Sequence, residues 1–395
     1  MKKILVVGGG AYQTPLIKRI IECGHEAYCV DGNPNAMGFE FATEHKHLDA
    51  LDKNACLEYA KEIGIDAVMS YGATLTLPTV AYIGEKLSLP ALPIETAELS
   101  KNKFNIKKRL AEHGCNIKGE FFELLSRDEK REIPLPCVIK PADGSGSKGV
   151  SLVYNESEIE AAVNYAFDGA RYGEVYVESL IEGEEYSAEA FVANGEIYVY
   201  AIVKTTFERL EGGEISYGHR TPSGLSEPLE RAIADEVKKA IKALNITMAS
   251  VNFDVILGSD DKKPYIIDCG IRVGQNLIAS HFVPLSRGVS VIDNTISLAL
   301  GEKVDAEPKF TRPIATRLLI YKPGVITEIK PMDALIGKDG IVDVVLRKGV
   351  GDVQNEYKEK SDTCGWVITT GNDPEEAEKN AVWAKKLLEN YIIIK

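Results

Sequence analysis

The chain has 395 residues, of which 45% are apolar and 27% are charged, and its net charge at pH 7 is −13. A chain of this length is too long for one compact core, which predicts two to four domains. The acidic balance argues against a nucleic-acid binder, because the footprint of such a protein is a basic patch.

Cysteine usage and the N-terminal residues bear on the compartment. Seven cysteines, an odd count without a Cys-x-x-Cys pair, indicate free thiols in a reducing environment. The apolar run after Met1-Lys2-Lys3 is too short for a signal peptide, and no run approaches the roughly 18 apolar residues of a membrane span. We therefore expect a cytoplasmic protein without a membrane partner.

The first residues predict a β-α-β unit. Ile4–Val7 is a continuous apolar strand of the kind buried in a parallel sheet, Gly8–Gly10 make a turn, and Thr14–Cys23 form a helix. A second strand, Ala27–Val30, ends at Asp31. A helix over Asn54–Ile63 and a strand over Ala67–Tyr71 continue the alternation, so that residues 1–97 are expected to form a doubly wound domain.

This unit is similar to a dinucleotide-binding fold, and an NAD enzyme is one hypothesis. However, Gly10 is followed by Ala11-Tyr12-Gln13, so the third glycine of the Gly-x-Gly-x-x-Gly fingerprint is missing. The incomplete fingerprint disfavours NAD.

The middle of the chain predicts two further blocks. The expected elements are helix Lys103–His113, strands Cys137–Lys140 and Ser151–Tyr154, helix Glu156–Phe167, strands Val175–Glu178, Tyr186–Val192 and Glu196–Val203, a glycine-rich loop over Glu211–Gly224, helix Pro228–Leu244, strands Ser250–Leu257 and Pro264–Cys269, and helix Ser290–Leu300. The tail from about Pro313 is expected to be α+β and to end in helix Pro374–Glu389 and strand Tyr391–Ile394.

The segment after Lys140 has the composition of a phosphate-binding loop. Lys140 and Pro141 end a strand, and Asp143-Gly144-Ser145-Gly146-Ser147-Lys148-Gly149 lead to the next strand. Glycines let the backbone approach a ligand closely, and successive N–H groups form an anion-binding nest. A hairpin with a flexible tip has the same composition, so the loop alone does not decide between the two readings.

Two acids lie in otherwise apolar strands. Asp254 and Asp268 are joined by a hairpin across Gly258-Ser259-Asp260-Asp261, which is expected to bring them side by side. Two close carboxylates raise one pKa strongly unless a cation neutralises them, and Mg²⁺ prefers a few carboxylates with phosphate oxygens and water. Exposure of one or both acids at a strand edge is the alternative.

Together these features resemble the ATP-grasp superfamily over nearly the whole chain. The resemblance implies an α/β and α+β multidomain protein with an N-terminal doubly wound domain over 1–97, a linker helix and lid over 98–180, a central domain with an antiparallel sheet over 181–312, and a C-terminal α+β extension over 313–395. It also implies ATP and Mg²⁺ as cofactors, with Mn²⁺ as an alternative ion.

The resemblance assigns roles to particular residues. Two lysines, Lys103 and Lys140, match basic ligands of the ATP phosphates. The mobile loop over the phosphates is matched by Gly144, Ser145, Gly146 and Ser147. The adenine hinge is matched by Glu178, Ser179, Leu180 and Ile181, and the acid that binds ribose is matched by Glu185. Asp254 and Asp268 match the metal carboxylates. Arg272 matches the arginine at the transferred phosphate, which with Lys140 makes the catalytic pair. His219, Arg220 and Asn276 are weaker candidates for substrate contacts.

One residue departs from the family pattern. The family commonly has Glu-x-Asn-x-Arg at the second metal strand, whereas this chain has Asp268-Cys269-Gly270-Ile271-Arg272. Gly270 replaces an asparagine that completes the metal shell, which puts the second metal position in doubt.

The C-terminal segment narrows the expected function. Tyr321–Ile326, Gly365–Gly371 and the helix with Glu375-Glu376-Ala377 are similar to the extension of L-amino-acid ligases. The resemblance implies a carboxylate–amine ligase that joins amino acids through an acyl phosphate, with small-molecule partners and a homodimeric assembly. A bicarbonate-using carboxylase or carbamoyl-phosphate-type synthetase and a non-catalytic ATP-binding module remain alternatives.

Overall fold

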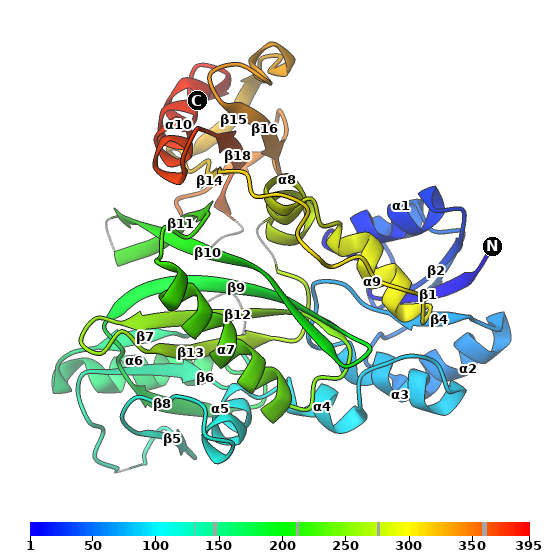
Figure 1. Ribbon diagram of the computed structural model, residues 1–395, viewed down its shortest axis with the longest axis horizontal. Coiled ribbons are helices and arrows are strands. Elements are labelled where there is room, and N and C mark those ends of the chain that lie inside the picture. The colour runs from blue at the N-terminus through cyan, green and yellow to red at the C-terminus, as the bar shows by residue number, and fades with distance from the viewer. Residues whose placement is uncertain (130, 145–147, 211–212, 275–276, 358–361) are drawn as a thin grey trace.

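The structure is a computed structural model, and it describes residues 1–395 except 130, 145–147, 211–212, 275–276 and 358–361. The N-terminal sheet lies to one side of a large central sheet, a small lid sheet lies beneath the central sheet, and the C-terminal segment projects above it (Figure 1).

The N-terminal sheet is parallel, with the strand order β3-β2-β1-β4. Leu5 and Val7 are fully buried, as the apolar run predicts. Helix α2 begins where the Asp52 carboxylate accepts two backbone N–H groups and ends at Gly64, whose φ is 67°. The elements are β1 (Lys3–Val7), α1 (Thr14–Glu22), β2 (Glu26–Asp31), η1 (Met37–Glu40), β3 (Glu44–His47), α2 (Lys53–Ile63), β4 (Ala67–Met69) and α3 (Leu77–Leu87).

The linker and lid follow. The lid is an antiparallel sheet with the order β5-β8-β6-β7, covered by helix α6. Asn155 and Glu158 form a reciprocal capping box that starts α6. The elements are α4 (Ile94–Leu99), α5 (Lys103–Glu112), β5 (Phe121–Leu124), β6 (Cys137–Pro141), β7 (Ser151–Val153), α6 (Glu156–Gly169) and β8 (Val175–Ser179).

The large sheet is antiparallel and continues from the central segment into the C-terminal one. Its order is β13-β12-β9-β10-β11-β14-β18-β16, and β11 pairs with β14 across the boundary near Arg312. Its elements are β9 (Gly183–Ala193), β10 (Glu196–Leu210), β11 (Gly213–Thr221), β12 (Ala249–Gly258), β13 (Pro264–Gly270), β14 (Ile314–Leu318), β16 (Ile341–Leu346) and β18 (Gly365–Thr370).

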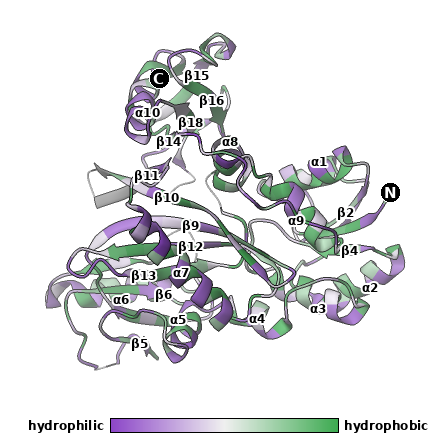
Figure 2. Ribbon diagram, in the orientation of Figure 1, coloured by the Kyte–Doolittle hydropathy of each residue, from purple (hydrophilic) through white to green (hydrophobic). Residues whose placement is uncertain are grey.

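Helices cover both faces of this sheet. Ala188 and Phe253 pack on one face against helix α7 (Glu227–Ala243), which carries hydrophobic and hydrophilic residues as a helix with one buried side should (Figure 2). Phe191 and Tyr200 point to the other face, toward η2 (Ile278–Phe282), α8 (Val283–Arg287), α9 (Val291–Ala299) and the N-terminal sheet. On this second face, the N-terminal, central and C-terminal segments share one hydrophobic core.

The C-terminal segment adds a small sheet and a long helix. Strand β15 pairs with β17 and β19, and α10 packs on β14 and β18. The elements are β15 (Gly324–Ile329), η3 (Asp333–Leu335), β17 (Val353–Gln354), α10 (Pro374–Leu388) and β19 (Ile392–Ile394). Within the described ranges, no helix is both long and apolar enough to cross a membrane.

One expectation from the sequence is wrong. The segment 211–224 was expected to be a glycine-rich loop, but Gly213–Thr221 form strand β11 between β10 and β14. A Cβ at Gly218 would lie 2.1 Å from the Thr316 carbonyl oxygen. The glycine therefore permits close pairing of two strands, a role that composition does not distinguish from a turn.

Candidate functional site

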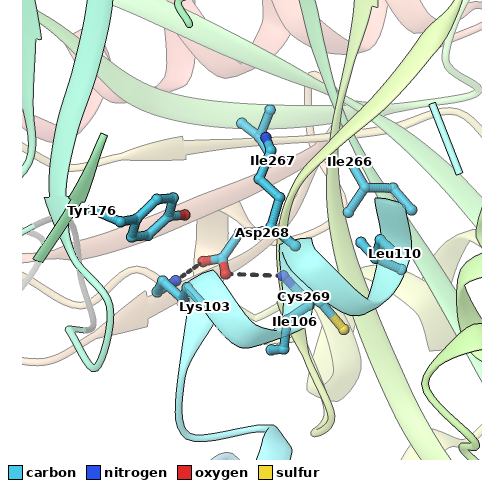
Figure 3. Close-up of a pocket in the computed structure, with 9 residues that line it drawn as sticks. Lys103, Ile106, Leu110, Tyr176, Ile266, Ile267, Asp268 and Cys269 are labelled. Atoms are coloured by element: carbon cyan, nitrogen blue, oxygen red, sulfur yellow. Dashed lines mark hydrogen bonds and ion pairs between the residues drawn. The ribbon is translucent and has the colours of Figure 1, made fainter. Parts of the chain in front are cut away.

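Helix α5 directs two lysines toward the junction of the lid and the central sheet. The helix starts after Asn102, whose side chain accepts a hydrogen bond from the Asn105 N–H at 2.8 Å. Lys103 forms an ion pair with Asp268, and Lys107, one turn later, forms an ion pair with Glu178 (Figure 3 shows the first pair). The sequence analysis missed Lys107, although its four-residue spacing from Lys103 could have indicated it.

Glu178 on strand β8 is buried between two lysines. Its side chain is 3% exposed and pairs with both Lys107 and Lys140. Burial would raise the pKa of Glu178, but the charges of Lys140 and Lys107 lower it. The sequence analysis predicted that Glu178 belongs to an adenine hinge, whereas in the structure its carboxylate is the counter-ion of Lys107 and Lys140.

Lys140 and Asp268 belong to the same charged group. The Lys140 ammonium donates a hydrogen bond to the Ile267 carbonyl at 3.2 Å. Burial would lower the pKa of Lys140, but the charge of Glu178 raises it, so the lysine stays charged. Burial would likewise raise the pKa of Asp268, whereas the charges of Lys103 and Lys140 lower it to about 2. Both groups are thus held ionised.

The hairpin brings the two candidate metal carboxylates together. Asp254 and Asp268 are direct cross-strand partners in the β12–β13 pair, as the sequence predicted. Asp254 accepts a hydrogen bond from Ser187 Oγ at 3.4 Å. Carboxylate oxygens are the hard donors that Mg²⁺ prefers, so these residues fit the ion. In the described part of the chain, no cluster of three or more His, Cys, Asp or Glu side chains is placed to hold a metal, and other oxygens would have to complete the shell.

Gly270 has a structural consequence for Arg272. A Cβ at Gly270 would lie 3.2 Å from Cζ of Arg272. The guanidinium therefore packs over the glycine, in the space that a larger side chain would enter. Arg272 also donates a hydrogen bond from Nη1 to the Val273 carbonyl at 2.9 Å. An asparagine at position 270 and the present position of Arg272 would compete for this space.

The remaining hinge and loop candidates are placed as follows. Ser179 Oγ accepts the Glu120 N–H at 2.9 Å, the Leu180 N–H donates to the Pro136 carbonyl at 3.1 Å, and Ile181 is buried. Glu185 lies on β9 opposite Ile256. Gly144 packs against Pro141. Ser145, Gly146, Ser147 and Asn276 lie outside the described residues.

The two weaker substrate candidates lie on strand β11. Arg220 pairs with Glu375 at 2.7 Å and with Glu378 at 3.5 Å, both on helix α10. These ion pairs tie the hairpin to the C-terminal helix. His219 is 8% exposed, and its backbone N–H donates to Thr316 Oγ1 at 3.2 Å.

A pocket adjoins the charged group. Its lining consists of Lys103, Lys107, Tyr176 and Asp268 together with apolar residues such as Ile106 and Leu110 (Figure 3). Its volume is only about 10 Å³, because these side chains nearly fill it. Charged groups at one wall and apolar groups at another suit a ligand that has both an anionic and a flat apolar part.

Comparison with known proteins agrees with this geometry. Residues 100–274 match the ATP-grasp domain, and residues 317–392 match the L-amino acid ligase C-terminal domain 2. The first match covers Lys103, Lys140, Asp254, Asp268 and Arg272.

Individual relatives are distant. The chain is 28% identical over 305 residues to an uncharacterized protein of Sinorhizobium fredii, a match over 73% of this chain and 61% of that one. It is 25% identical over 389 residues to the phosphoribosylamine–glycine ligase of Methanocaldococcus jannaschii, over 93% of this chain and 78% of that one. The chain spans about half to three fifths of the length of the first curated relatives it matches.

Among solved structures, an L-amino acid ligase from Bacillus licheniformis has the same fold. The TM-score is 0.83 at 21% sequence identity, over 100% of this chain and 99% of that one. The fold expected from the sequence is therefore confirmed.

Proposed function

Because the chain carries an ATP-grasp domain joined to an L-amino acid ligase C-terminal domain, we propose that it is an ATP- and Mg²⁺-dependent carboxylate–amine ligase that acts on amino acids. The observation that carries this proposal is the meeting of Lys103, Lys140, Asp254 and Asp268, from four different elements, at one point.

In the proposed reaction, a substrate carboxylate oxygen attacks the γ-phosphorus of ATP, the bond to the bridging oxygen breaks, and ADP leaves. The resulting acyl phosphate is attacked by the nitrogen of an amine, phosphate departs, and an amide forms. The protein acts by positioning the reactants and stabilising charge.

The residues of the site have separate roles in this proposal. Lys103 and Lys140 neutralise the phosphates, and Arg272 contacts the transferred phosphoryl group through its planar fork. Asp254 and Asp268 would hold Mg²⁺, which supplies further charge neutralisation when bound. Tyr176, whose ring centroid lies 5.2 Å from the Lys140 ammonium, helps to fix this lysine.

The test is phosphate release from MgATP across the proteinogenic amino acids, singly and in pairs, with bicarbonate as a separate arm. We expect release that needs an amino-acid pair, with a joined product in the mass spectrum. Release with bicarbonate alone would assign a carboxylase instead, and ATP binding without release under any condition would assign a nucleotide-binding module.

A lysine variant links the activity to the site. Replacing Lys140 with Met keeps most of the side-chain volume and removes the charge, so we expect kcat/KM to fall about 10²–10³-fold. Lys338→Met, on an exposed residue, is the matched control and should keep wild-type activity. Equal activity of both variants would contradict the assigned role of Lys140.

A further inference from the structure

Glu189 on strand β9 is fully buried without a cation partner among the described side chains. It is 0% exposed, and its Oε1 atom accepts a hydrogen bond from the Asn252 amide at 2.6 Å. Its Oε2 atom is also buried and has no hydrogen-bond partner among the residues that the structure describes. A buried carboxylate in this state is costly, because removal from water is only partly offset by opposite charge and hydrogen bonds.

The surroundings of Glu189 do not remove this cost. Burial raises the pKa of Glu189 to about 8, and the charge of Asp254 acts in the same direction. The Asn252 hydrogen bond, the Arg272 charge and a hydrogen bond from the Gly274 backbone N–H oppose this only in part. The backbone of Gly274 closes one side, where a Cβ would lie 2.5 Å from Oε1. Buried titratable groups with strongly perturbed pKa values concentrate at functional sites.

A second unpaired polar atom lies nearby on the N-terminal domain. Tyr71 follows strand β4 and is 7% exposed, and its hydroxyl has no hydrogen-bond partner in the described chain. Burial and the charge of Glu189 raise the pKa of Tyr71, and they raise that of Tyr200 on β10 as well. This polar group therefore spans the junction of two domains and includes two oxygens, Glu189 Oε2 and the Tyr71 hydroxyl, without hydrogen-bond partners among the described residues.

This group is close to the reacting centre. Asn252 also donates to Ser187 Oγ at 2.6 Å, and Ser187 donates to Asp254. Residues two apart on a strand share a face at a spacing of roughly 7 Å. Glu189 and Ser187 share a face in this way, so Glu189 lies about one such step from the carboxylate pair.

An apolar cavity adjoins the same group. It lies between the N-terminal domain and the central sheet, is partly open to solvent and has a volume of about 80 Å³. Its wall includes Ser70, Ser250 and Arg272 among residues such as Leu77, Met248 and Leu298. Ser70 precedes Tyr71, and Ser250 Oγ lies 3.5 Å from the Tyr200 hydroxyl. Residues of the cavity wall are therefore adjacent to Tyr71 and Tyr200 of the polar group.

We propose that Glu189, together with the Tyr71 hydroxyl, binds the α-ammonium group of the amino acid whose carboxylate is activated, and that the side chain of this amino acid occupies the apolar cavity. The identity of the ligand rests on the proposed function. An ammonium supplies the donors and the charge that Glu189 lacks, Arg272 faces the carboxylate end, and the cavity selects an apolar side chain.

Binding without turnover tests the proposal. Calorimetry with the full-length protein and a non-hydrolysable MgATP analogue would use three pairs of probes: L-leucine and 4-methylpentanoate, L-methionine and 4-(methylthio)butanoate, and L-phenylalanine and 3-phenylpropanoate. We expect wild type to prefer at least one amino acid over its des-amino partner. Glu189→Gln should weaken binding of that amino acid about 10–100-fold and leave the des-amino acid unaffected. Tyr71→Phe should weaken it by a smaller factor of about 2–10.

Glu196→Gln is the matched control, because Glu196 is exposed and lies on the same hairpin. It should bind as wild type does. A folded Glu189→Gln protein that keeps the amino-acid preference would overturn the proposal, and so would a wild type that binds none of the three amino acids. Glu189-dependent binding without any ATP turnover would instead contradict the proposed ligase function alone.

Discussion

Glu178 and Glu189 are buried glutamates on consecutive strands, β8 of the lid sheet and β9 of the large sheet, and their pKa values shift in opposite directions. Glu178 is 3% exposed and Glu189 is 0% exposed. Burial acts in the same direction on both, yet the pKa of Glu178 is lowered by two lysines whereas that of Glu189 is raised to about 8. Burial alone therefore does not determine the charge of a carboxylate, because the partner decides it.

The difference distinguishes a carboxylate that stabilises the structure, Glu178, from one that we propose binds a ligand, Glu189. The Lys107–Glu178–Lys140 group is complete and holds the lid, the linker helix and the central sheet together. Glu189 is incomplete, and a ligand can complete it. Four substitutions test this contrast, from the largest expected effect to the smallest.

Glu178→Gln removes the anion that two buried lysines share. Breaking a buried ion pair by deleting one partner typically costs about 3–5 kcal/mol, because an uncompensated charge remains. We expect the free energy of unfolding in urea to fall by about this amount and ATP affinity to fall with it. A loss below about 1 kcal/mol would show that Glu178 does not stabilise the lysines.

Lys107→Met removes one of the two cations and keeps the aliphatic stem. Burial lowers the pKa of Lys107, and Glu178 opposes this only in part, so Lys107 is the less firmly charged of the two lysines. Because Lys140 still neutralises Glu178, the expected loss in unfolding free energy is smaller, roughly 1.5–3 kcal/mol. A loss as large as that of Glu178→Gln would contradict this ranking.

The sequence predicts these features unevenly. Asp254 and Asp268 stand out because each is a charge in an apolar strand, and a short hairpin fixes their pairing. Glu189, in Ser187-Ala188-Glu189-Ala190, has the same character, but Tyr71, which we propose binds the same ligand group, comes from another domain. No local spacing relates the two, just as none predicts that Gly218 lies close to the Thr316 carbonyl oxygen of β14. Contacts within a hairpin or a helix turn are predictable, whereas contacts between domains depend on packing.

Glu189→Gln should change stability in the opposite direction. An acid whose folded pKa of about 8 exceeds the ordinary value of 4.5 holds its proton better in the native state. Unfolding then releases a proton, so the native state loses stability as pH rises from about 4.5 to 8. The glutamine variant has no such proton. We expect it to be more stable than wild type by roughly 1–3 kcal/mol at pH 8, with the difference vanishing near pH 4.5. A pH-independent difference in urea midpoints would show that Glu189 is charged in the native state.

Glu62→Gln sets the lower limit of the comparison. Glu62 forms an ion pair with Lys46 at 3.2 Å, and the two side chains are 69% and 46% exposed. Because water already solvates both charges, removing one leaves no desolvated partner behind. We expect unfolding free energy to change by less than about 0.5 kcal/mol, and the small change to shrink further at 1 M salt. If Glu62→Gln instead cost as much as Glu178→Gln, the large effect at Glu178 would reflect loss of any ion pair and not the burial of uncompensated lysines.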